Sequence, residues 1–350
     1  MSEGNPLTKQ LTLPDLGWSA FFLSQLEIVE FEETKPARVS SVHRDRVSVV
    51  TEDGITDLVT EAGMSTGDIA VGDWVLAHPS EHRIVRQLDR KSTLQRGSEH
   101  HVRERQLIAA NIDTLFITTS CNADFNVARL ERYLALAHDA EVTPVILITK
   151  SDQVDDPSVY VSKAQKLGRG LEVIAMNAKE TQSADLLAPW CGKGQTVALV
   201  GSSGVGKTTL TNALTGGTAA TQGIREDDAR GRHTTTGRSL HALPSGGWLI
   251  DTPGMRGLGV ADVSYGIDAT FPEISELADQ CKFRDCKHEG EPGCAVTAAI
   301  EEGAIEPDRL KRYQKLKRED YYATETLAEA HQRQRKFGKM VKSAMKKKGR

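Results

Sequence analysis

The 350-residue sequence predicts a multidomain α/β protein in which a small β-barrel precedes a larger α/β domain and a C-terminal metal-binding and helical region. Between residues 37 and 100, short runs that alternate apolar and polar residues are separated by turn residues, which is typical of a small barrel. Between residues 101 and 272, continuous apolar runs alternate with helical segments, which indicates a parallel sheet with helices on both faces. Residues 273–322 contain three of the five cysteines, and helical, charge-rich sequence continues over residues 323–350.

The composition is that of an ordinary globular chain, with 39% hydrophobic and 26% charged residues. No apolar run approaches the roughly 20 residues that a bilayer-spanning helix needs. Residues 1–10 also lack the basic-then-apolar pattern of a secretory signal. We therefore expect a cytoplasmic protein without a membrane partner, and we expect it to be a monomer.

The formal net charge of −4 hides a strong asymmetry between the two ends of the chain. Residues 1–36 form an acidic leader, whereas nine cations and no acid occur between residues 330 and 350. A cationic tail of this kind gains affinity for a polyanion by releasing counterions, so it suggests an RNA partner. A solvated tail is the alternative, and the two descriptions are compatible.

The leader and the barrel are predicted from apolar patterning. Residues 18–26 (WSAFFLSQL) form an amphipathic stretch that we expect to pack onto a neighbouring domain. Five short strands are then predicted at ARVSSV, RVSVVT, DLVTEA, DWVLAH and RIVRQL, with a hairpin-type turn at Asp53-Gly54. An OB-fold fits this length, although an SH3-like barrel would produce the same pattern.

A phosphate-binding loop follows the apolar strand TVALV and precedes a helix. The segment has the pattern GxxxxGK[ST], in which the glycines let backbone N–H groups wrap the phosphates. It comprises Gly201, Ser202, Ser203, Gly204, Val205, Gly206, Lys207, Thr208 and, on the helix, Thr209. Lys207 is expected to reach the β- and γ-phosphates, and the Thr208 hydroxyl is expected to ligate Mg²⁺.

Two further strand ends carry residues that would select the base. Thr149, Lys150, Ser151 and Asp152 follow the strand PVILI and are similar to the Asn-Lys-x-Asp motif of GTPases. The Asp152 carboxylate would accept hydrogen bonds from guanine N1–H and the exocyclic amine, a pair of donors that adenine lacks. Thr149 replaces the usual asparagine, so we expect weaker anchoring of this loop. Where GTPases carry a Ser-Ala-Lys-like loop contacting guanine O6, this chain has Asn177, Ala178 and Lys179.

Asp251 and Gly254 belong to a DTPG turn at the end of the strand GWLI. Downstream of a phosphate-binding loop, this aspartate can hold the Mg²⁺ shell and this glycine N–H can contact the γ-phosphate. The order of the motifs is circularly permuted, because the guanine motifs precede the phosphate-binding loop. Permutation also places the C-terminal region directly after the DTPG turn, which ties nucleotide-dependent movement to whatever that region binds.

These motifs in this order resemble the circularly permuted GTPases that depend on the small ribosomal subunit, the RsgA type. The resemblance covers about residues 37–322. It implies an N-terminal OB-fold, a circularly permuted P-loop GTPase domain and a C-terminal zinc domain. It also implies a GTP hydrolase that acts in late maturation of the small subunit, binds its rRNA and is stimulated by it.

Residues 231–237 (GRHTTTG) match the switch I segment of this family, in which Thr235 would complete the Mg²⁺ shell. Met255 stands where Ras-type enzymes carry a catalytic glutamine. An apolar side chain cannot orient water, so slow intrinsic hydrolysis is expected. His233 is the candidate within the chain for the missing catalytic group, and a merely solvated loop histidine is the alternative.

Cys281, Cys286, His288 and Cys294 offer three thiols and one imidazole within fourteen positions. Three thiolates and one imidazole make a closed tetrahedral zinc shell without an open position for chemistry, so one structural zinc is predicted. The spacing also agrees with the zinc domain of the resembled family. The alternative is a set of reduced, unliganded cysteines, which at this density would be a liability.

Two other classes of protein account for only part of this pattern. A P-loop phosphotransferase acting on a small molecule explains the phosphate-binding loop, but not the guanine motif, the permuted order or the flanking modules. An RNA-binding protein with a relic nucleotide domain does not explain the intact Lys207, Thr208 and Asp251. The sequence therefore favours an Mg²⁺-dependent GTP hydrolase with Lys207, His233 and Thr235 as catalytic candidates.

Overall fold

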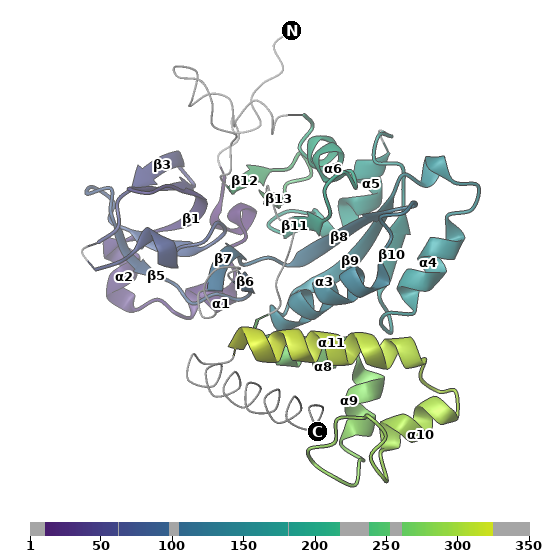
Figure 1. The fold of residues 1–350 in the computed structure, drawn as a ribbon. Coiled ribbons are helices and arrows are strands. Elements are labelled where there is room, and N and C mark those ends of the chain that lie inside the picture. The colour runs from purple at the N-terminus through teal and green to yellow at the C-terminus, as the bar shows by residue number, and fades with distance from the viewer. Residues whose placement is uncertain are drawn as a thin grey trace, which may run out of the picture.

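The computed structural model describes residues 11–61, 63–97, 105–180, 182–217, 238–252 and 261–324. Among these residues, no helix is both long and apolar enough to cross a bilayer. A unit of short strands, a central sheet with helices on both faces and a group of C-terminal helices follow one another along the chain (Figure 1).

Five parallel strands form the central sheet, in the spatial order β10, β9, β8, β11 and β13. Their bounds are Glu172–Ala175 (β10), Thr143–Thr149 (β9), Thr114–Ser120 (β8), Thr196–Gly201 (β11) and Trp248–Asp251 (β13). A sixth strand, β12 (Ser239–Ala242), pairs antiparallel with β13. Every position of β8 and β11 is buried, which explains why these strands are continuous apolar runs in the sequence.

Helices cover both faces of this sheet, so the predicted α/β architecture is confirmed. The helices are α3 (Val127–Asp139), α4 (Ser158–Gln165), α5 (Ser183–Leu187) and α6 (Lys207–Leu214), with short 3-10 helices η4 (Ser151–Gln153) and η5 (Ala188–Trp190). Ile117 and Ile146 point to one face and pack with α3 and α4. Their neighbours Phe116 and Val145 point to the other face and pack with α5 and α6.

The N-terminal strands pair in a closed ring. They are β1 (Lys35–Val42), β2 (Val47–Thr51), β3 (Gly54–Leu58), β4 (Trp74–Ala77) and β5 (Ile84–Gln87), with a 3-10 helix η3 (Thr66–Asp68) between β3 and β4. β1 pairs with β2 and β4, β2 pairs with β3, and β4 pairs with β5. A bridge between Val59 and Arg83 joins the end of β3 to the start of β5 and closes the ring.

The turn between β2 and β3 confirms one prediction and corrects another. Thr51 pairs with Gly54, which takes a φ of 119°, so the hairpin turn at Asp53-Gly54 is present. The sequence predicts the third strand at residues 57–62, whereas the strand runs over Gly54–Leu58. Because the turn is tight, pairing resumes as soon as the chain has reversed.

The leader packs onto the ring of strands, as expected. Its elements are η2 (Leu13–Leu16), α1 (Ala20–Leu23) and α2 (Ile28–Glu33). Trp18 and Phe22 contact Trp74 of β4, with ring centroids 4.8 Å and 5.7 Å from that of Trp74. Phe22 and Trp74 are almost completely buried in this contact.

Two features of the strand pairing are not predicted from the sequence. Ser41 of β1 pairs with Ser239 of β12, so strands of both units form one continuous sheet. A hairpin of β6 (Thr93–Gly97) and β7 (Arg105–Ala110) forms a separate two-stranded sheet. A single cross-strand pair leaves no periodic signal in the sequence.

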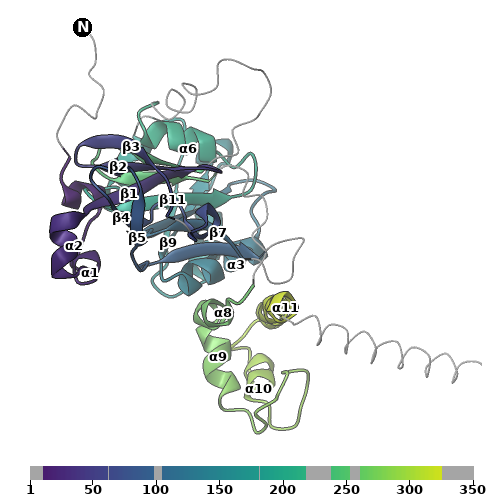
Figure 2. The same ribbon diagram turned by 90° about the vertical axis from the view of Figure 1, so that its left-hand side faces the viewer.

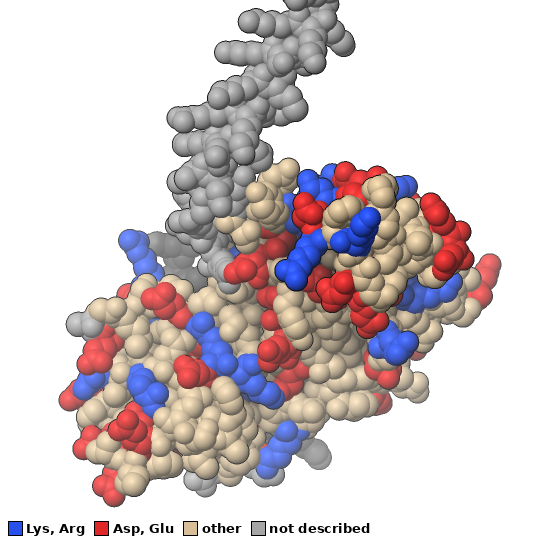
Figure 3. Space-filling view, turned by 90° about the horizontal axis from the view of Figure 1, so that it is seen from below, with Lys and Arg blue, Asp and Glu red and all other residues tan. Residues whose placement is uncertain are grey.

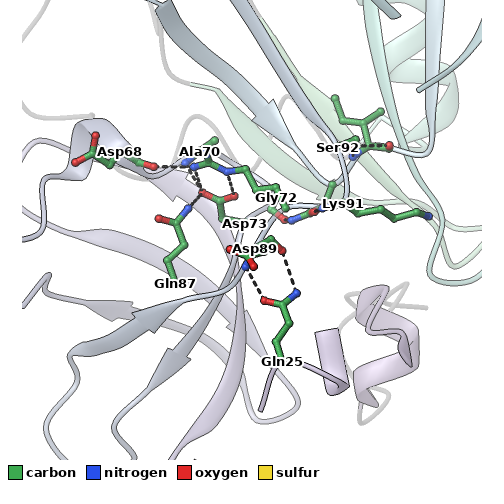
Figure 4. Close-up of polar contacts among 12 residues, drawn as sticks. Gln25, Asp68, Ala70, Gly72, Asp73, Gln87, Asp89, Lys91 and Ser92 are labelled. Carbon is green, nitrogen blue, oxygen red and sulfur yellow. Dashed lines mark hydrogen bonds and ion pairs between the residues drawn. The ribbon is translucent and has the colours of Figure 1, made fainter. Parts of the chain in front are cut away.

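Polar contacts, some of them buried, hold the leader, the ring and the chain leading into β6 together (Figure 4). The fully buried Asp73 carboxylate accepts hydrogen bonds from Arg90, Gln87 and a backbone N–H, at 2.7–2.8 Å. Burial raises the pKa of Asp73, and these donors oppose that shift by stabilising the charged form. Gln25 of the leader exchanges two hydrogen bonds with the backbone of Asp89, at 2.7 and 3.3 Å.

The C-terminal unit consists of helices. They are α8 (Ser264–Thr270), α9 (Pro272–Ala278), α10 (Ala295–Glu301) and α11 (Pro307–Thr324). α8 and α11 lie next to the central domain, whereas α9 and α10 extend away from it (Figure 2). The contact between α8 and α3 needs a glycine, because a Cβ at Gly266 would lie 1.9 Å from the Ala135 carbonyl oxygen.

Candidate nucleotide-binding site and metal centre

The phosphate-binding loop connects β11 to α6, and its backbone depends on glycine. Gly201 has a φ of 143°, and a Cβ there would lie 2.2 Å from the Thr118 carbonyl oxygen of the neighbouring β8. Gly206 caps α6 with a φ of 98°. α6 therefore begins at Lys207, and the N–H groups of its first turn have no partners within the helix. Such a helix end favours an anion.

Lys207 lies over this loop. Its Nζ donates to the carbonyl oxygens of Gly201 at 2.7 Å and Ser202 at 2.6 Å. The ammonium group is thus held at the loop whose backbone would wrap the phosphates. Bound phosphate oxygens would offer it stronger, charge-assisted hydrogen bonds than these carbonyls do.

The guanine motif lies beside the loop, and Thr149 connects the two. Its buried hydroxyl is 2.5 Å from the Val205 carbonyl oxygen of the loop and 3.0 Å from the Thr119 carbonyl oxygen of β8. Lys150 then takes a left-handed φ of 59°, which turns the chain into η4. The threonine thus anchors the motif to the phosphate-binding loop, although its single hydroxyl proton can be donated to only one of the two carbonyl oxygens at a time.

The loop after β10 completes this side of the site. The Asn177 side chain accepts a hydrogen bond from the Lys179 N–H at 3.1 Å and donates one to the Glu180 carboxylate at 3.1 Å. The backbone carbonyl of Asn177 accepts a third from Ser183 Oγ at 2.6 Å. These contacts fix the tight turn that carries Ala178. The Asn177 side chain thus holds the turn, which explains how asparagine substitutes for the more usual serine.

Parts of the three motifs line one cavity of about 160 Å³. Its walls are Thr149, Lys150, Asp152, Gln153, Asn177, Ala178, Lys179, Gly204, Gly206 and Thr209. Gln153 is the one of these lining residues that lies outside the sequence motifs, although its position next to Asp152 could have indicated it. Motifs separated by up to about sixty residues in the sequence therefore meet at the carboxyl ends of parallel strands.

Asp251 ends β13, which pairs with the strand that leads into the phosphate-binding loop. Thr252 is buried and donates to the Leu199 carbonyl oxygen at 3.0 Å, which fixes the start of the DTPG turn. His241 on β12 is a neighbour that the sequence does not reveal. Burial lowers its pKa, and the Asp251 charge opposes that shift.

Several predicted features lie outside the described residues. They are His233, Thr235, Gly254, Met255 and the basic tail.

The four predicted metal ligands come together in the C-terminal unit. The ligand atoms of Cys281, Cys286, His288 and Cys294 all lie within 4.8 Å of one another. The sulfurs of Cys281 and Cys294 are 3.9 Å apart, and His288 Nδ1 lies 3.6 and 3.4 Å from them. A tetrahedral zinc with Zn–S bonds of about 2.3 Å needs sulfurs about 3.8 Å apart, so the cluster is compatible with one zinc ion.

Local contacts hold the ligand loop in this shape. Although burial acts to raise it, the pKa of the Cys294 thiol falls to about 6, because Thr297 and His288 stabilise the thiolate. Glu291 accepts from the N–H groups of Lys287 and Glu289 at 2.8 and 2.7 Å, and these bonds lower its pKa to about 2. The loop is therefore arranged around a charged carboxylate and a thiolate.

Comparisons with known proteins agree with this geometry. The family model described as RsgA GTPase matches residues 87–261. The small ribosomal subunit biogenesis GTPase RsgA of Mesorhizobium japonicum is 55% identical over 91% of this chain and 94% of its own. A second relative, the small ribosomal subunit biogenesis GTPase RsgA 2 of Vibrio parahaemolyticus, is 46% identical over 99% of this chain and 94% of its own.

Solved structures show the same architecture. YjeQ from Thermotoga maritima superimposes with a TM-score of 0.60 at 26% identity, covering 81% of this chain and 97% of that one. YloQ, described as a circularly permuted GTPase, gives a TM-score of 0.57 at 25% identity, covering 81% and 93% of the two chains. With the permuted motif order and the family match, these similarities mean that the chain belongs to the RsgA GTPase family of GTP-hydrolysing enzymes.

Proposed function

We propose that this enzyme hydrolyses GTP to GDP and phosphate as a late maturation factor of the small ribosomal subunit, and that it binds the rRNA of that subunit. The observation that carries the proposal is the cavity in which the guanine motif and the phosphate-binding loop meet. Relatives that match nearly the whole chain are named as small ribosomal subunit biogenesis GTPases, which supports this partner.

The cavity residues divide into two roles in this proposal. Lys150, Ser151 and Asp152 would select guanine, with the turn at Asn177, Ala178 and Lys179 closing the base pocket. The backbone of Gly201, Ser202, Ser203, Gly204, Val205 and Gly206 and the first turn of α6, with Lys207, Thr208 and Thr209, would hold the phosphates. Thr149 would keep the two parts in register through its contact with the Val205 carbonyl.

Mg²⁺ would be held by Thr208, Asp251 and Thr235, and when bound it would neutralise charge on the phosphates. Gly254 would contact the γ-phosphate. Because Met255 cannot orient water, we assign that task to His233, which would act together with Thr235 when the partner binds.

The flanking parts would bind the ribosomal partner. We propose an OB-type barrel over residues 37–100, supported by the ring of strands that closes through Val59 and Arg83. We assign the GTPase domain to residues 101–272 and the zinc domain, with one structural zinc, to residues 273–322. Residues 1–36 and 323–350 would be the leader and the basic tail of a cytoplasmic monomer.

The base-selecting role can be tested by replacing Asp152 with asparagine. The amide should pair with the 2-carbonyl of xanthine, so GTP affinity should fall and XTP affinity should rise by about 10- to 100-fold each, as expected for hydrogen bonds to a charged group. Nucleotide titration measures both. Asp155→Asn, three residues along and exposed, is the matched control. An unchanged preference for GTP over XTP in Asp152→Asn would show that another residue selects the base.

The partner can be tested by measuring GTP turnover with purified small subunits, large subunits and free RNA. Only the small subunit should accelerate hydrolysis, and His233→Ala should lower the accelerated rate while leaving affinity for the subunit nearly intact. Equal acceleration by large subunits or free RNA would remove the proposed partner but leave the GTPase.

The basic tail should contribute salt-dependent affinity for the subunit. On the face shown in Figure 3, Lys and Arg side chains of the described residues are interspersed with Asp and Glu, so this face offers no large basic patch. Truncation after Ala330 removes nine cations and should weaken binding and flatten its salt dependence. Binding curves at several salt concentrations would measure this, and an unchanged slope would exclude the tail from the contact.

A further inference from the structure

Arg129 lies in the first turn of α3 and contacts the phosphate-binding loop. Its Nη1 donates to Ser202 Oγ and, at 3.4 Å, to the Asp124 carbonyl oxygen. Lys207 Nζ donates to the carbonyl oxygen of the same Ser202 at 2.6 Å. Ser202 is thus held twice: Arg129 binds its side-chain hydroxyl, and Lys207 binds its backbone carbonyl.

The stability of α3 does not account for this arginine. A cation in the first turn of a helix opposes the helix dipole, which costs about 0.3–1 kcal/mol. Within the part of the chain that the structure describes, no carboxylate forms an ion pair with Arg129. A half-buried guanidinium without a carboxylate, beside a phosphate-binding loop, is suited to an anion that the nucleotide brings.

Two residues further along α3, Glu131 anchors the C-terminal helices. It is completely buried and accepts hydrogen bonds from Arg309 Nη1 and Arg312 Nε of α11, each at 2.7 Å. Arg309 also stacks on Phe271, 4.1 Å from the ring centroid, and bonds to Glu273 of α9 at 2.8 Å. Because a buried charge that loses a partner is strongly destabilising, this network allows little change in how α11 sits on α3.

The two contacts leave α3 in opposite directions. Residues two apart on an α-helix are about 200° apart around its axis. Arg129 therefore reaches the phosphate-binding loop while Glu131 reaches α11, which runs alongside α3 in Figure 1. Leu130 and Leu134 are buried in the core, so the helix that carries both contacts is itself packed against the sheet.

We propose that Arg129 is a positioning residue of the phosphate site, and that α3 links it through Glu131 to the docking of the C-terminal helices. When GTP binds, Lys207 exchanges the carbonyls of Gly201 and Ser202 for phosphate oxygens. Arg129 then keeps Ser202 in place and adds positive charge beside the loop. A partner that shifts α11 changes this contact through α3. The phosphate-binding role of the loop and the effect of a partner both rest on the proposed function.

The role of Arg129 can be tested on the full chain without any partner. Arg129→Ala should lower kcat about tenfold, because a charge-assisted contact to the loop is lost. It should change KM less than about threefold and leave the Tm unaltered, a split that a merely structural role would not give. Arg129→Lys should restore part of kcat. Lys163→Ala, an exposed cation on α4, is the control. If Arg129→Ala behaves like Lys163→Ala, the positioning role is refuted.

The link through α3 can be tested with a double-mutant cycle. Arg312→Ala leaves Glu131 paired with Arg309, and it should lower kcat severalfold although Arg312 does not contact the loop. In the Arg129→Ala background it should have no further effect. Lys311→Ala, which removes an exposed pair with Asp308, should leave kcat unchanged.

The outcomes separate the link from the proposed partner. If the double variant loses kcat by the product of the two single losses, Arg129 and Arg312 act independently and the link is refuted. A wild-type kcat in Arg312→Ala would refute it as well. Failure of the small subunit to stimulate the wild-type enzyme would instead refute only the partner, because both tests of the link use the free enzyme.

Discussion

Replacing Lys207 with alanine should abolish GTP turnover. In the structure its ammonium group already lies on the phosphate-binding loop, bonded to Gly201 and Ser202. Alanine removes the charge that would stabilise the β- and γ-phosphates, and phosphoryl transfer depends almost entirely on positioning and electrostatic stabilisation. We expect a loss of at least about a hundredfold in kcat/KM, comparable to removing one donor from an oxyanion hole.

Phosphate release at saturating and limiting GTP would measure this loss. Lys166→Ala, which removes an exposed cation next to α4, is the matched control and should retain wild-type rates. Turnover of Lys207→Ala within a few-fold of the wild type would mean that the loop binds phosphate in some other way, and the site assignment would have to be abandoned.

If the four ligands hold zinc as proposed, removing the zinc should unfold the ligand loop of the C-terminal unit while sparing nucleotide binding. Structural zinc contributes roughly 10–16 kcal/mol in small zinc-binding peptides, far more than the short α9 and α10 can recover by packing. Cys286→Ser deletes one ligand. We expect one zinc per chain in the wild type and a large loss of zinc in this variant, with increased hydrogen exchange over residues 281–301.

Elemental analysis and hydrogen exchange would measure these effects, and GTP titration would show whether the cavity at Asp152 is unaffected. Cys191→Ser is the control, because Cys191 is buried in the core of the GTPase domain and should not change the zinc content. A metal-free wild-type chain whose C-terminal unit is fully protected from exchange would contradict the zinc assignment.

The residues within each motif determine much of this protein by themselves. The phosphate-binding loop needs Gly201 because its backbone angle and a close neighbour exclude a side chain, and it needs Gly206 because of its positive φ. Both requirements are visible in the sequence as a fixed spacing. The ligands Cys281 to Cys294 are close in sequence, so their meeting is a local property of a short loop. Parallel strands are also visible locally, because burial on both faces makes each one a continuous apolar run.

Contacts between distant segments depended on the tertiary structure. Glu131 and Arg309 are 178 residues apart, and Thr149 reaches Val205 across 56 residues. Neither pair has a periodicity or spacing that could reveal it, so the sequence assigned no role to Glu131 and did not predict the contact of Thr149 with the phosphate-binding loop. Such side chains acquire partners only when the order of the strands and the packing of α11 on α3 bring them within hydrogen-bond distance. The motifs thus determined the chemistry, whereas the packing of strands and helices decided which residues hold the motifs in position.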